Sequence, residues 1–229
     1  MKLLALDTST ELCSAAIWLD GALSAREATR QRGHSELILP MIEQLLLETG
    51  IGLAQLDAIA FGRGPGAFTG VRLAAGVAQG LAFAAQLPLL PISDLRALAA
   101  QALPLAGACD WALVCQDARM NEVYWGCFER LADDVRLLGA EAVAAPAGVA
   151  LPPGLRRARV CGVGSGFAAY AQQLSAATAG LTTVFADLRP RATEIARLAA
   201  HDGLTRAIAA EQAQPVYLRD DVAQAPSRD

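Results

Sequence analysis

The fold is decided by the stretch LVCQDARMNEVYWGCF at residues 113–128, which repeats the pattern of LLALDTSTELCSAAIW at residues 3–18. When Asp117 is laid on Asp7, both stretches contain an apolar strand, an aspartate at its end, a short turn and a returning apolar strand. A pattern that occurs only twice indicates duplicated domains rather than a solenoid. Strands that alternate with helical patterns follow each copy, which predicts the α/β class.

The residues around the first copy extend it into a domain. The Asp20-Gly21 pair predicts a hairpin turn into a third strand, so the chain opens with an antiparallel meander. A helix is expected over residues 35–49, with Ser35 as its N-cap and Gly50 as its stop.

The repeat also predicts the domain boundary. We expect an N-terminal domain of residues 1–105 and a C-terminal domain of residues 106–229. The last predicted helix, at residues 192–201, is expected to pack back on the N-terminal domain.

Composition excludes several classes of protein. The 229 residues carry 19 Lys and Arg against 23 Asp and Glu, a net charge of −4, and 54% of them are hydrophobic. Disordered chains show the reverse balance, and stand-alone nucleic-acid binders carry a basic surplus. The longest apolar stretch, around residues 71–85, contains Arg72 and Gln79 and is too short to span a membrane, so no membrane association is expected.

Cysteine use predicts the compartment. The five cysteines form no Cys-x-x-Cys pair and lie mostly in apolar runs, so we expect buried, reduced thiols. Asp7 interrupts the apolar N-terminus too early for a signal peptide. Reduced thiols without a signal peptide predict a cytoplasmic location.

Two stretches are candidates for binding a phosphate group. The first, residues 7–10, follows a buried strand at the edge of the sheet where ligands usually bind. The second, GRGPGAFTGVR at residues 62–72, has glycines that allow close backbone approach, and Thr69 is expected to cap a helix whose N-terminus attracts anions. The candidate nucleotide or phosphate contacts are Asp7, Thr8, Thr10, Arg63, Gly64 and Arg72. The alternative is structural: the turn residues satisfy backbone amides, and the arginines pair with surface acids.

Small residues recur every fourth position in the helix expected over residues 69–86. Gly76, Gly80 and Ala84 leave a flat groove on which another helix can pack closely. Glycine inside a helix costs up to about 1 kcal/mol relative to alanine, so two of them require a packing reason. That reason is either the core of this chain or a helix of a partner.

Five motifs together resemble a known family. They are LALDTST at residues 4–10, GHSE at 33–36, GRGPGAFTGVR at 62–72, DARMNEVY at 117–124 and PVYLR at 215–219. In combination, and over the whole chain, they resemble the TsaB family, also called YeaZ, of bacterial tRNA threonylcarbamoyladenosine biosynthesis.

The resemblance implies both a fold and a function. The fold is that of actin, Hsp70 and sugar kinases (ASKHA), with two related α/β domains, each a mixed sheet flanked by helices, which agrees with the repeat. The function is that of a non-catalytic subunit that binds TsaD, the homologue that transfers threonylcarbamoyl to N6 of adenosine 37 in tRNAs reading codons that begin with A. The ATPase TsaE joins the same complex, and tRNA is reached indirectly through it. We expect ATP or ADP and a metal in the partner subunits, and no cofactor in this chain.

One departure from the catalytic homologue supports a non-catalytic subunit. That homologue carries a His-x-x-x-His metal pair on its first helix, whereas the matching helix here has His34 followed by Ile38. No other cluster in the sequence has metal-ligand spacing.

The family's dimer interface uses the first two helices of the N-terminal domain, and isolated members can form homodimers through the same surface. Helical spacing then selects the candidate contacts Leu37, Ile38, Met41, Ile42, Leu45, Val71, Ala74, Ala75, Ala78 and Leu81. On this choice of face, an Ala78→Arg substitution is predicted to block association with TsaD.

Two other functions compete with the non-catalytic subunit. An ASKHA-type kinase or ATPase would hold phosphate with residues 7–10 and metal with Asp117. A metallopeptidase-like enzyme would need the missing histidine pair. Nucleotide titration of the isolated protein separates the first of these from the subunit hypothesis.

Overall fold

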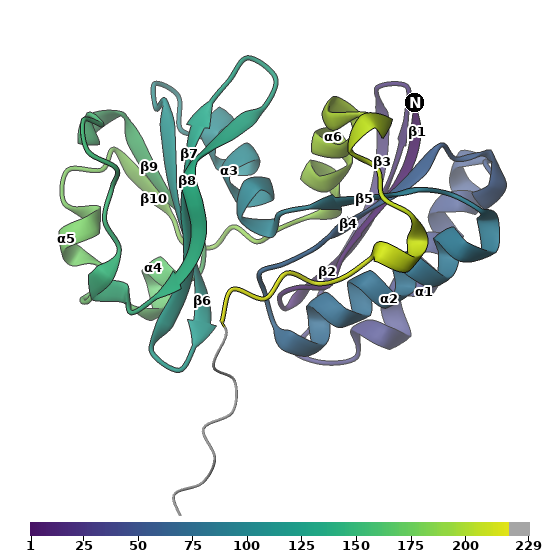
Figure 1. Cartoon of the computed structure of the whole chain (residues 1–229), viewed down its shortest axis with the longest axis horizontal. Coiled ribbons are helices and arrows are strands. Elements are labelled where there is room, and N and C mark those ends of the chain that lie inside the picture. Colours follow the sequence, from purple (N-terminus) through teal and green to yellow (C-terminus); the bar gives the residue numbers. More distant parts are fainter. Residues whose placement is uncertain (220–229) are drawn as a thin grey trace, which may run out of the picture.

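The computed structural model describes residues 1–219 and forms two lobes, each built around a five-stranded sheet (Figure 1). The first sheet contains β1 (Lys2–Asp7), β2 (Leu12–Leu19), β3 (Ala22–Thr29), β4 (Ala58–Gly62) and β5 (Leu89–Ile92). The second contains β6 (Trp111–Arg119), β7 (Glu122–Arg130), β8 (Val135–Ala144), β9 (Val160–Val163) and β10 (Thr183–Phe185).

Both sheets have the same topology. The first runs β3-β2-β1-β4-β5 and the second, read from its other edge, β8-β7-β6-β9-β10. In each, the central strand pairs antiparallel with the second strand and parallel with the fourth. Asp7 ends the central strand of the first sheet, and Asp117 lies near the end of the central strand of the second. This duplication confirms the predicted α/β class and the two related ASKHA-type sheets.

The strands β1, β2, β4 and β5 of the first sheet are largely buried on both faces, whereas the edge strand β3 is partly exposed. Leu4 and Leu6 point toward α1 (His34–Thr49) and α2 (Phe68–Ala85), whereas Leu3 and Ala5 point toward α6 (Ala192–Asp202). Successive side chains of a strand alternate between faces, so a strand covered on both sides reads as a continuous apolar run. This burial accounts for much of the apolar excess of the chain.

The helix α2 is long and apolar enough to meet the length and composition criteria for a membrane span, with a mean hydropathy of 1.2. In the fold it packs on the first sheet, and Val71, Ala74, Ala75, Ala78 and Ala82 are buried there. Its apolar character on that side is therefore explained by the core.

The two lobes exchange helices. The helix α3 (Asp94–Leu105) packs mainly on β6, β7, β8 and β9 of the second sheet, whereas α6, from the second half of the sequence, packs on the first. The helices α4 (Gly166–Ala169) and α5 (Ser175–Thr178) belong to the other face of the second sheet. The predicted boundary at residue 105 therefore does not coincide with the boundary between the lobes, because α3 lies before it and packs on the second sheet. Short 3-10 helices complete the elements: η1 (Leu53–Gln55), η2 (Pro146–Gly148), η3 (Arg157–Arg159), η4 (Leu204–Arg206) and η5 (Ala210–Gln212).

The turn and helix-end predictions are right at some positions and wrong at others. Asp20 and Gly21 have positive φ angles in the β2–β3 turn, and Gly50 ends α1 in the left-handed conformation, as expected. Ser35 and Thr69 are not caps. α1 begins at His34 after Gly33, and α2 begins at Phe68 after an extended Ala67, and neither helix has a side-chain cap.

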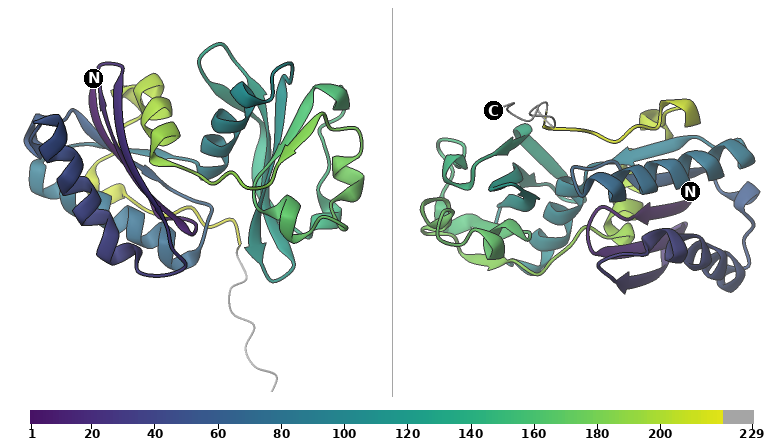
Figure 2. Two further views of the ribbon diagram at one scale, coloured as in Figure 1. Left: turned by 180° about the vertical axis from the view of Figure 1, so that it is seen from behind. Right: turned by 90° about the horizontal axis from the view of Figure 1, so that it is seen from below.

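The last described residues form a segment that joins the lobes (Figure 2). Ile208 pairs with Leu89 at the edge of the first sheet, and the Val216 N–H donates to the Arg63 carbonyl oxygen at 2.8 Å. Further on, the Arg219 guanidinium donates to the Ala118 carbonyl oxygen of the second lobe at 3.1 Å. We call residues 208–219 the C-terminal segment.

Candidate functional site

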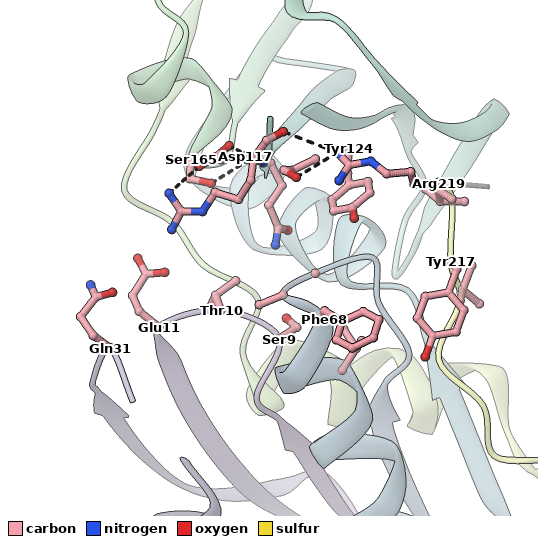
Figure 3. A pocket seen from close by; sticks show the side chains of 18 residues that line it. Ser9, Thr10, Glu11, Gln31, Phe68, Asp117, Tyr124, Ser165, Tyr217 and Arg219 are labelled. Atoms are coloured by element: carbon pink, nitrogen blue, oxygen red, sulfur yellow. Dashed lines mark hydrogen bonds and ion pairs between the residues drawn. The ribbon is translucent and has the colours of Figure 1, made fainter. Parts of the chain in front are cut away.

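A cavity of about 360 Å³ lies between the two lobes. Its walls are the β1–β2 turn and the start of α2 on one side, the β6–β7 hairpin on the other, and the end of the C-terminal segment. In Figure 3, Asp117, Tyr124 and Ser165 face Ser9, Thr10 and Phe68 across the gap, with Tyr217 and Arg219 along one side. The remaining lining residues are Glu11, Gln31, Gly66, Ala67, Val71, Gln116, Ala118, Arg119, Val216 and Leu218.

Asp7, the leading candidate for phosphate chemistry, lies beneath this cavity and does not line it. Its side chain is fully buried and accepts hydrogen bonds from the Ser9 N–H and the Ser9 hydroxyl, each at 3.1 Å. Asp94, at the start of α3, is also fully buried. Gly62 leaves room for both: a Cβ there would lie 2.4 Å from Asp94 Oδ1 and 2.5 Å from Asp7 Oδ1.

The two carboxyl groups form a coupled buried pair. Burial raises the pKa of Asp7 to about 6, and burial together with the Asp7 charge raises the pKa of Asp94 well above its usual value. Two carboxylates this close cannot both ionise cheaply in a buried site, so the pair retains a proton.

This pair predicts a pH dependence of stability. Both pKa values are raised in the folded state, so the folded protein keeps protons that the unfolded chain releases above pH about 4. The stability contribution of the pair is therefore complete below that pH and is lost as the pH rises, through about 6 for Asp7. An Asp94→Asn variant, which removes one charge and keeps the shape, should be more stable than the wild type by about 2 kcal/mol at pH 8.

Urea unfolding of both proteins between pH 5 and pH 8 measures this effect. The advantage of Asp94→Asn should grow as the pH rises. A constant difference across this range would contradict a shared proton.

The other predicted phosphate contacts are mostly engaged within the chain. The Thr8 hydroxyl donates to the Gly70 carbonyl oxygen at 2.7 Å, and Arg63 pairs with Glu141 at 3.3 Å. The Arg72 guanidinium lies 3.2 Å from the centre of the Phe68 ring. Gly64 (φ +97°) packs against the C-terminal segment, where a Cβ would lie 3.2 Å from the Val216 carbonyl oxygen. Of the six candidates only Thr10 lines the cavity. The structural alternative therefore describes Asp7, Thr8, Arg63 and Gly64, whereas Arg72, within the described residues, stacks on Phe68 instead of pairing with an acid.

Asp117 holds the β6–β7 hairpin together. Its Oδ1 accepts from the Tyr170 hydroxyl at 2.9 Å and from the Arg119 N–H at 2.8 Å, and its Oδ2 lies 3.2 Å from the Arg119 guanidinium. Arg119, Met120 and Asn121 all have positive φ angles, so the hairpin turns in a conformation that these contacts hold in place. The Asp-Ala-Arg motif thus shapes one wall of the cavity.

His34 also has an internal contact. Its Nε2 lies 2.8 Å from the carbonyl oxygen of Thr10, and Ile38, one turn later, is buried in the core. Within residues 1–219, no group of three His, Cys, Asp or Glu side chains is placed to hold a metal ion. The five cysteines are buried and free, as predicted.

The predicted face of α1 and α2 is mostly occupied by the core of this chain. Of the ten proposed contacts, Ile38, Ile42, Leu45, Val71, Ala74, Ala75 and Ala78 are buried in this chain, and Leu37, Met41 and Leu81 pack against the same core. Helical spacing identifies an apolar face, and in the fold that face packs on the first sheet of this chain. Arginine at Ala78 would therefore disrupt the core instead of testing an interface.

The opposite side of the same helices carries a second apolar surface. Leu47 is 75% exposed, Phe83 71% and Leu39 49%. Gly76 and Gly80 belong to this side, and a Cβ on either would meet no atom within 4 Å. The glycines therefore satisfy no packing need within this chain. We call these five residues the outer face of α1 and α2; beside it lies an apolar hollow of about 760 Å³ lined by Leu39, Leu46, Leu47 and Leu81 among others.

Comparison with known proteins identifies the family. Residues 26–227 match the family model described as TsaD, tRNA N6-adenosine threonylcarbamoyltransferase. The chain is 41% identical to the tRNA threonylcarbamoyladenosine biosynthesis protein TsaB of Haemophilus influenzae, over 97% of this chain and 95% of the relative. It is 38% identical to TsaB of Escherichia coli, over 97% and 96%.

Solved structures agree with these sequence matches. YeaZ from Pseudomonas aeruginosa superposes with a TM-score of 0.85 at 43% identity, covering 95% of this chain and 99% of that one. A second Pseudomonas aeruginosa structure, described as similar to peptidase YeaZ, gives 0.86 at 44% identity over the same shares. The resemblance read from the five motifs is thereby confirmed, and the chain belongs to the TsaB (YeaZ) family of tRNA threonylcarbamoyladenosine biosynthesis proteins.

Proposed function

We propose that this chain is a non-catalytic subunit of the threonylcarbamoyladenosine machinery that binds the catalytic homologue TsaD through the outer face of α1 and α2. The observation that carries the proposal is the position of Gly76 and Gly80, which lie exposed in the middle of an 18-residue helix where a Cβ would meet no atom within 4 Å. Glycine at such positions costs helix stability, and close approach of a partner helix offsets that cost.

The surrounding residues support a protein partner. Leu39, Leu47 and Phe83 add large exposed apolar side chains to the small-residue strip, a combination typical of interaction surfaces. Because residues 26–227 match the TsaD family model, we infer that TsaD presents equivalent helices to this surface, as a second copy of this chain does. We expect the isolated protein to form a homodimer through the face that TsaD occupies in the complex.

The charged groups of the cleft support a subunit without its own catalytic centre. Asp7 accepts hydrogen bonds from Ser9 and lies buried beside Asp94, and Asp117 is held by Tyr170 and Arg119, so both aspartates are engaged within the chain. We infer that ATP or ADP and the metal belong to TsaD and TsaE. With a net charge of −4, this chain is also poorly suited to hold tRNA alone.

The competing function is an ATPase or kinase with its phosphate site at residues 7–10. It loses its main support because the Asp7 carboxylate accepts from the Ser9 hydroxyl and the Thr8 hydroxyl donates to the Gly70 carbonyl oxygen. Titration of the isolated protein with ATP separates the two functions. Micromolar binding with turnover, abolished by Asp7→Ala, would favour the enzyme and overturn the subunit proposal.

We predict that Gly80→Arg weakens association with TsaD at least about 100-fold, because a long charged side chain must be desolvated in the interface. The substitution fits the isolated fold, since nothing lies within 4 Å of a Cβ at this position. Co-purification of tagged TsaD with the variant, in the presence of TsaE and ATP, measures the loss.

The matched control is Ala147→Arg, at an exposed position of η2 in the second lobe. It should co-purify like the wild type. Wild-type co-purification of a folded Gly80→Arg protein would contradict docking on this face.

A further inference from the structure

The PVYLR motif at residues 215–219 lies in the C-terminal segment, and the outer face of α1 and α2 uses none of its residues. The segment begins on the first lobe. Ile208 and Leu89 exchange two backbone hydrogen bonds, of 2.8 Å and 2.9 Å, at the edge of the first sheet. The Gln79 side chain of α2 then donates to the Ala210 carbonyl oxygen at 2.9 Å. The start of the segment is therefore fixed to the sheet and to α2.

The motif itself crosses the start of α2. The Val216 N–H donates to the Arg63 carbonyl oxygen at 2.8 Å. The Tyr217 ring follows, with its centre 4.7 Å from the Arg72 guanidinium, which also stacks on Phe68. A guanidinium over an aromatic ring is attracted by the negative face of the ring. The first lobe therefore holds the segment as far as residue 217.

Arg219 carries the segment to the second lobe. Its guanidinium donates to the Ala118 carbonyl oxygen at 3.1 Å, pairs with Glu122 and lies 3.4 Å from the Met120 sulfur. All three partners belong to the β6–β7 hairpin. The Arg219 side chain is only 17% exposed, and hydrogen bonds from a charged donor are stronger than those between neutral groups. Two residues after Tyr217, the segment is thus anchored on the other lobe.

The position of this tie restricts the lobes. Within residues 1–219, the backbone also passes between the lobes from β5 to α3 and from β10 to α6. In the right-hand view of Figure 2, the C-terminal segment and the linker from β10 to α6, residues 186–191, run along opposite faces of the molecule. Lobes that are joined by linkers can turn about them as hinges, and a tie on the opposite face restricts that turn.

We propose that the C-terminal segment is a brace that holds the two lobes at one angle, and that Arg219 is the side chain that closes it. The brace fixes the second lobe relative to α2, the helix that carries Gly76 and Gly80. It uses no residue of the outer face of α1 and α2, so the brace and the docking proposal stand or fall separately.

The distance between two spin labels on the full chain, measured by pulsed electron resonance, tests the brace. Arg32→Cys in the first lobe and Ala168→Cys in the second provide exposed labelling positions. They lie close in sequence to Gln31 and Ser165, which line the cavity between the lobes. The five native cysteines are buried, and the protein without introduced cysteines serves as the labelling blank. The labelled chain with an intact brace should give one narrow distance distribution.

Arg219→Ala should broaden this distribution toward longer distances, because the lobes then turn about the remaining linkers. Arg219→Lys keeps a charged donor at the hairpin and should broaden it less. The matched control is Arg157→Ala, because the Arg157 guanidinium donates to the carbonyl oxygens of Ala176 at 3.1 Å and Ala179 at 2.9 Å within the second lobe. Its loss should leave the distribution between the lobes unchanged.

An unchanged distribution in a folded Arg219→Ala protein would overturn the proposal. Equal broadening in Arg157→Ala would also overturn it, since the effect would then come from general loosening of the second lobe. If Arg219→Ala does not fold, Glu122→Gln takes its place. This variant removes the ion pair from the hairpin side and must broaden the distribution in the same direction for the brace to stand.

Discussion

A Gly70→Ala variant should be destabilised by about 3–5 kcal/mol, more than the roughly 1–3 kcal/mol that overpacking usually costs. A Cβ at this position would lie 2.1 Å from the Thr8 carbonyl oxygen and 3.2 Å from the Ser9 Cα. Both neighbours are backbone atoms, so no side-chain rotation relieves the clash. The helix α2 or the β1–β2 turn must move, and the hydrogen bond from the Thr8 hydroxyl to the Gly70 carbonyl oxygen is lost with that movement.

The same helix contains the matched control. Gly76 is also helical, but a Cβ there would meet nothing within 4 Å. Gly76→Ala should therefore stabilise the isolated chain by about 0.5–1 kcal/mol, through helix propensity alone. Urea unfolding of the three proteins gives both differences. A Gly70→Ala protein as stable as the wild type would show that α2 and the β1–β2 turn are not in close contact.

Gly70 also shows what the glycine-rich stretch can and cannot predict about the structure. The glycine-rich stretch predicts that its backbone closely approaches another group, and the structure shows such close approaches at Gly62, Gly66 and Gly70. The approached groups, however, are part of the same chain: Asp7 and Asp94 at Gly62, Ser9 at Gly66 and Thr8 at Gly70. A glycine reports that space is needed and does not report what fills it. Close approach to a phosphate and close approach to a neighbouring turn therefore produce the same glycine pattern in the sequence.

The repeat was the strongest signal, because strand order follows from local patterns that occur twice. The face of each helix was harder to assign. Spacing shows that α1 and α2 are apolar, but Ala78 and Gly80 belong to opposite sides of one helix, one in the core and one exposed. Only the position of the sheet decides between them.

The exchange of α3 and α6 between the lobes could not be predicted from the sequence either, because it depends on contacts between residues far apart in the chain. One side chain, Arg96 of α3, joins the exchanged parts. Its guanidinium donates to Asp134 at 2.7 Å and 2.8 Å and to Asp202 at 2.7 Å and 2.8 Å. Asp134 lies in the turn between β7 and β8, and Asp202 is the last residue of α6. One arginine thus ties the second sheet to the helix that covers the first.

Removing this arginine should cost about 3–4 kcal/mol. The Asp134 and Asp202 side chains are only 15% and 17% exposed, so Arg96→Ala leaves two poorly solvated carboxylates facing each other. The loss of one partner from a buried ion pair costs more than the pair itself contributes, because the remaining charge is uncompensated. Here two charges remain, and their repulsion acts between α6 and the second lobe.

Urea unfolding of Arg96→Ala at pH 7 measures the cost, with Arg136→Ala as the matched control. Arg136 pairs with Glu129 on the surface and is 63% exposed, so its loss should change stability by less than about 0.5 kcal/mol. Double substitution of Asp134 and Asp202 by asparagine in the Arg96→Ala background should recover part of the loss, since it removes both stranded charges. If Arg96→Ala and Arg136→Ala were equally stable, the contact between α3 and α6 would rest on apolar packing and on the hydrogen bond that Gln101 donates to Glu194.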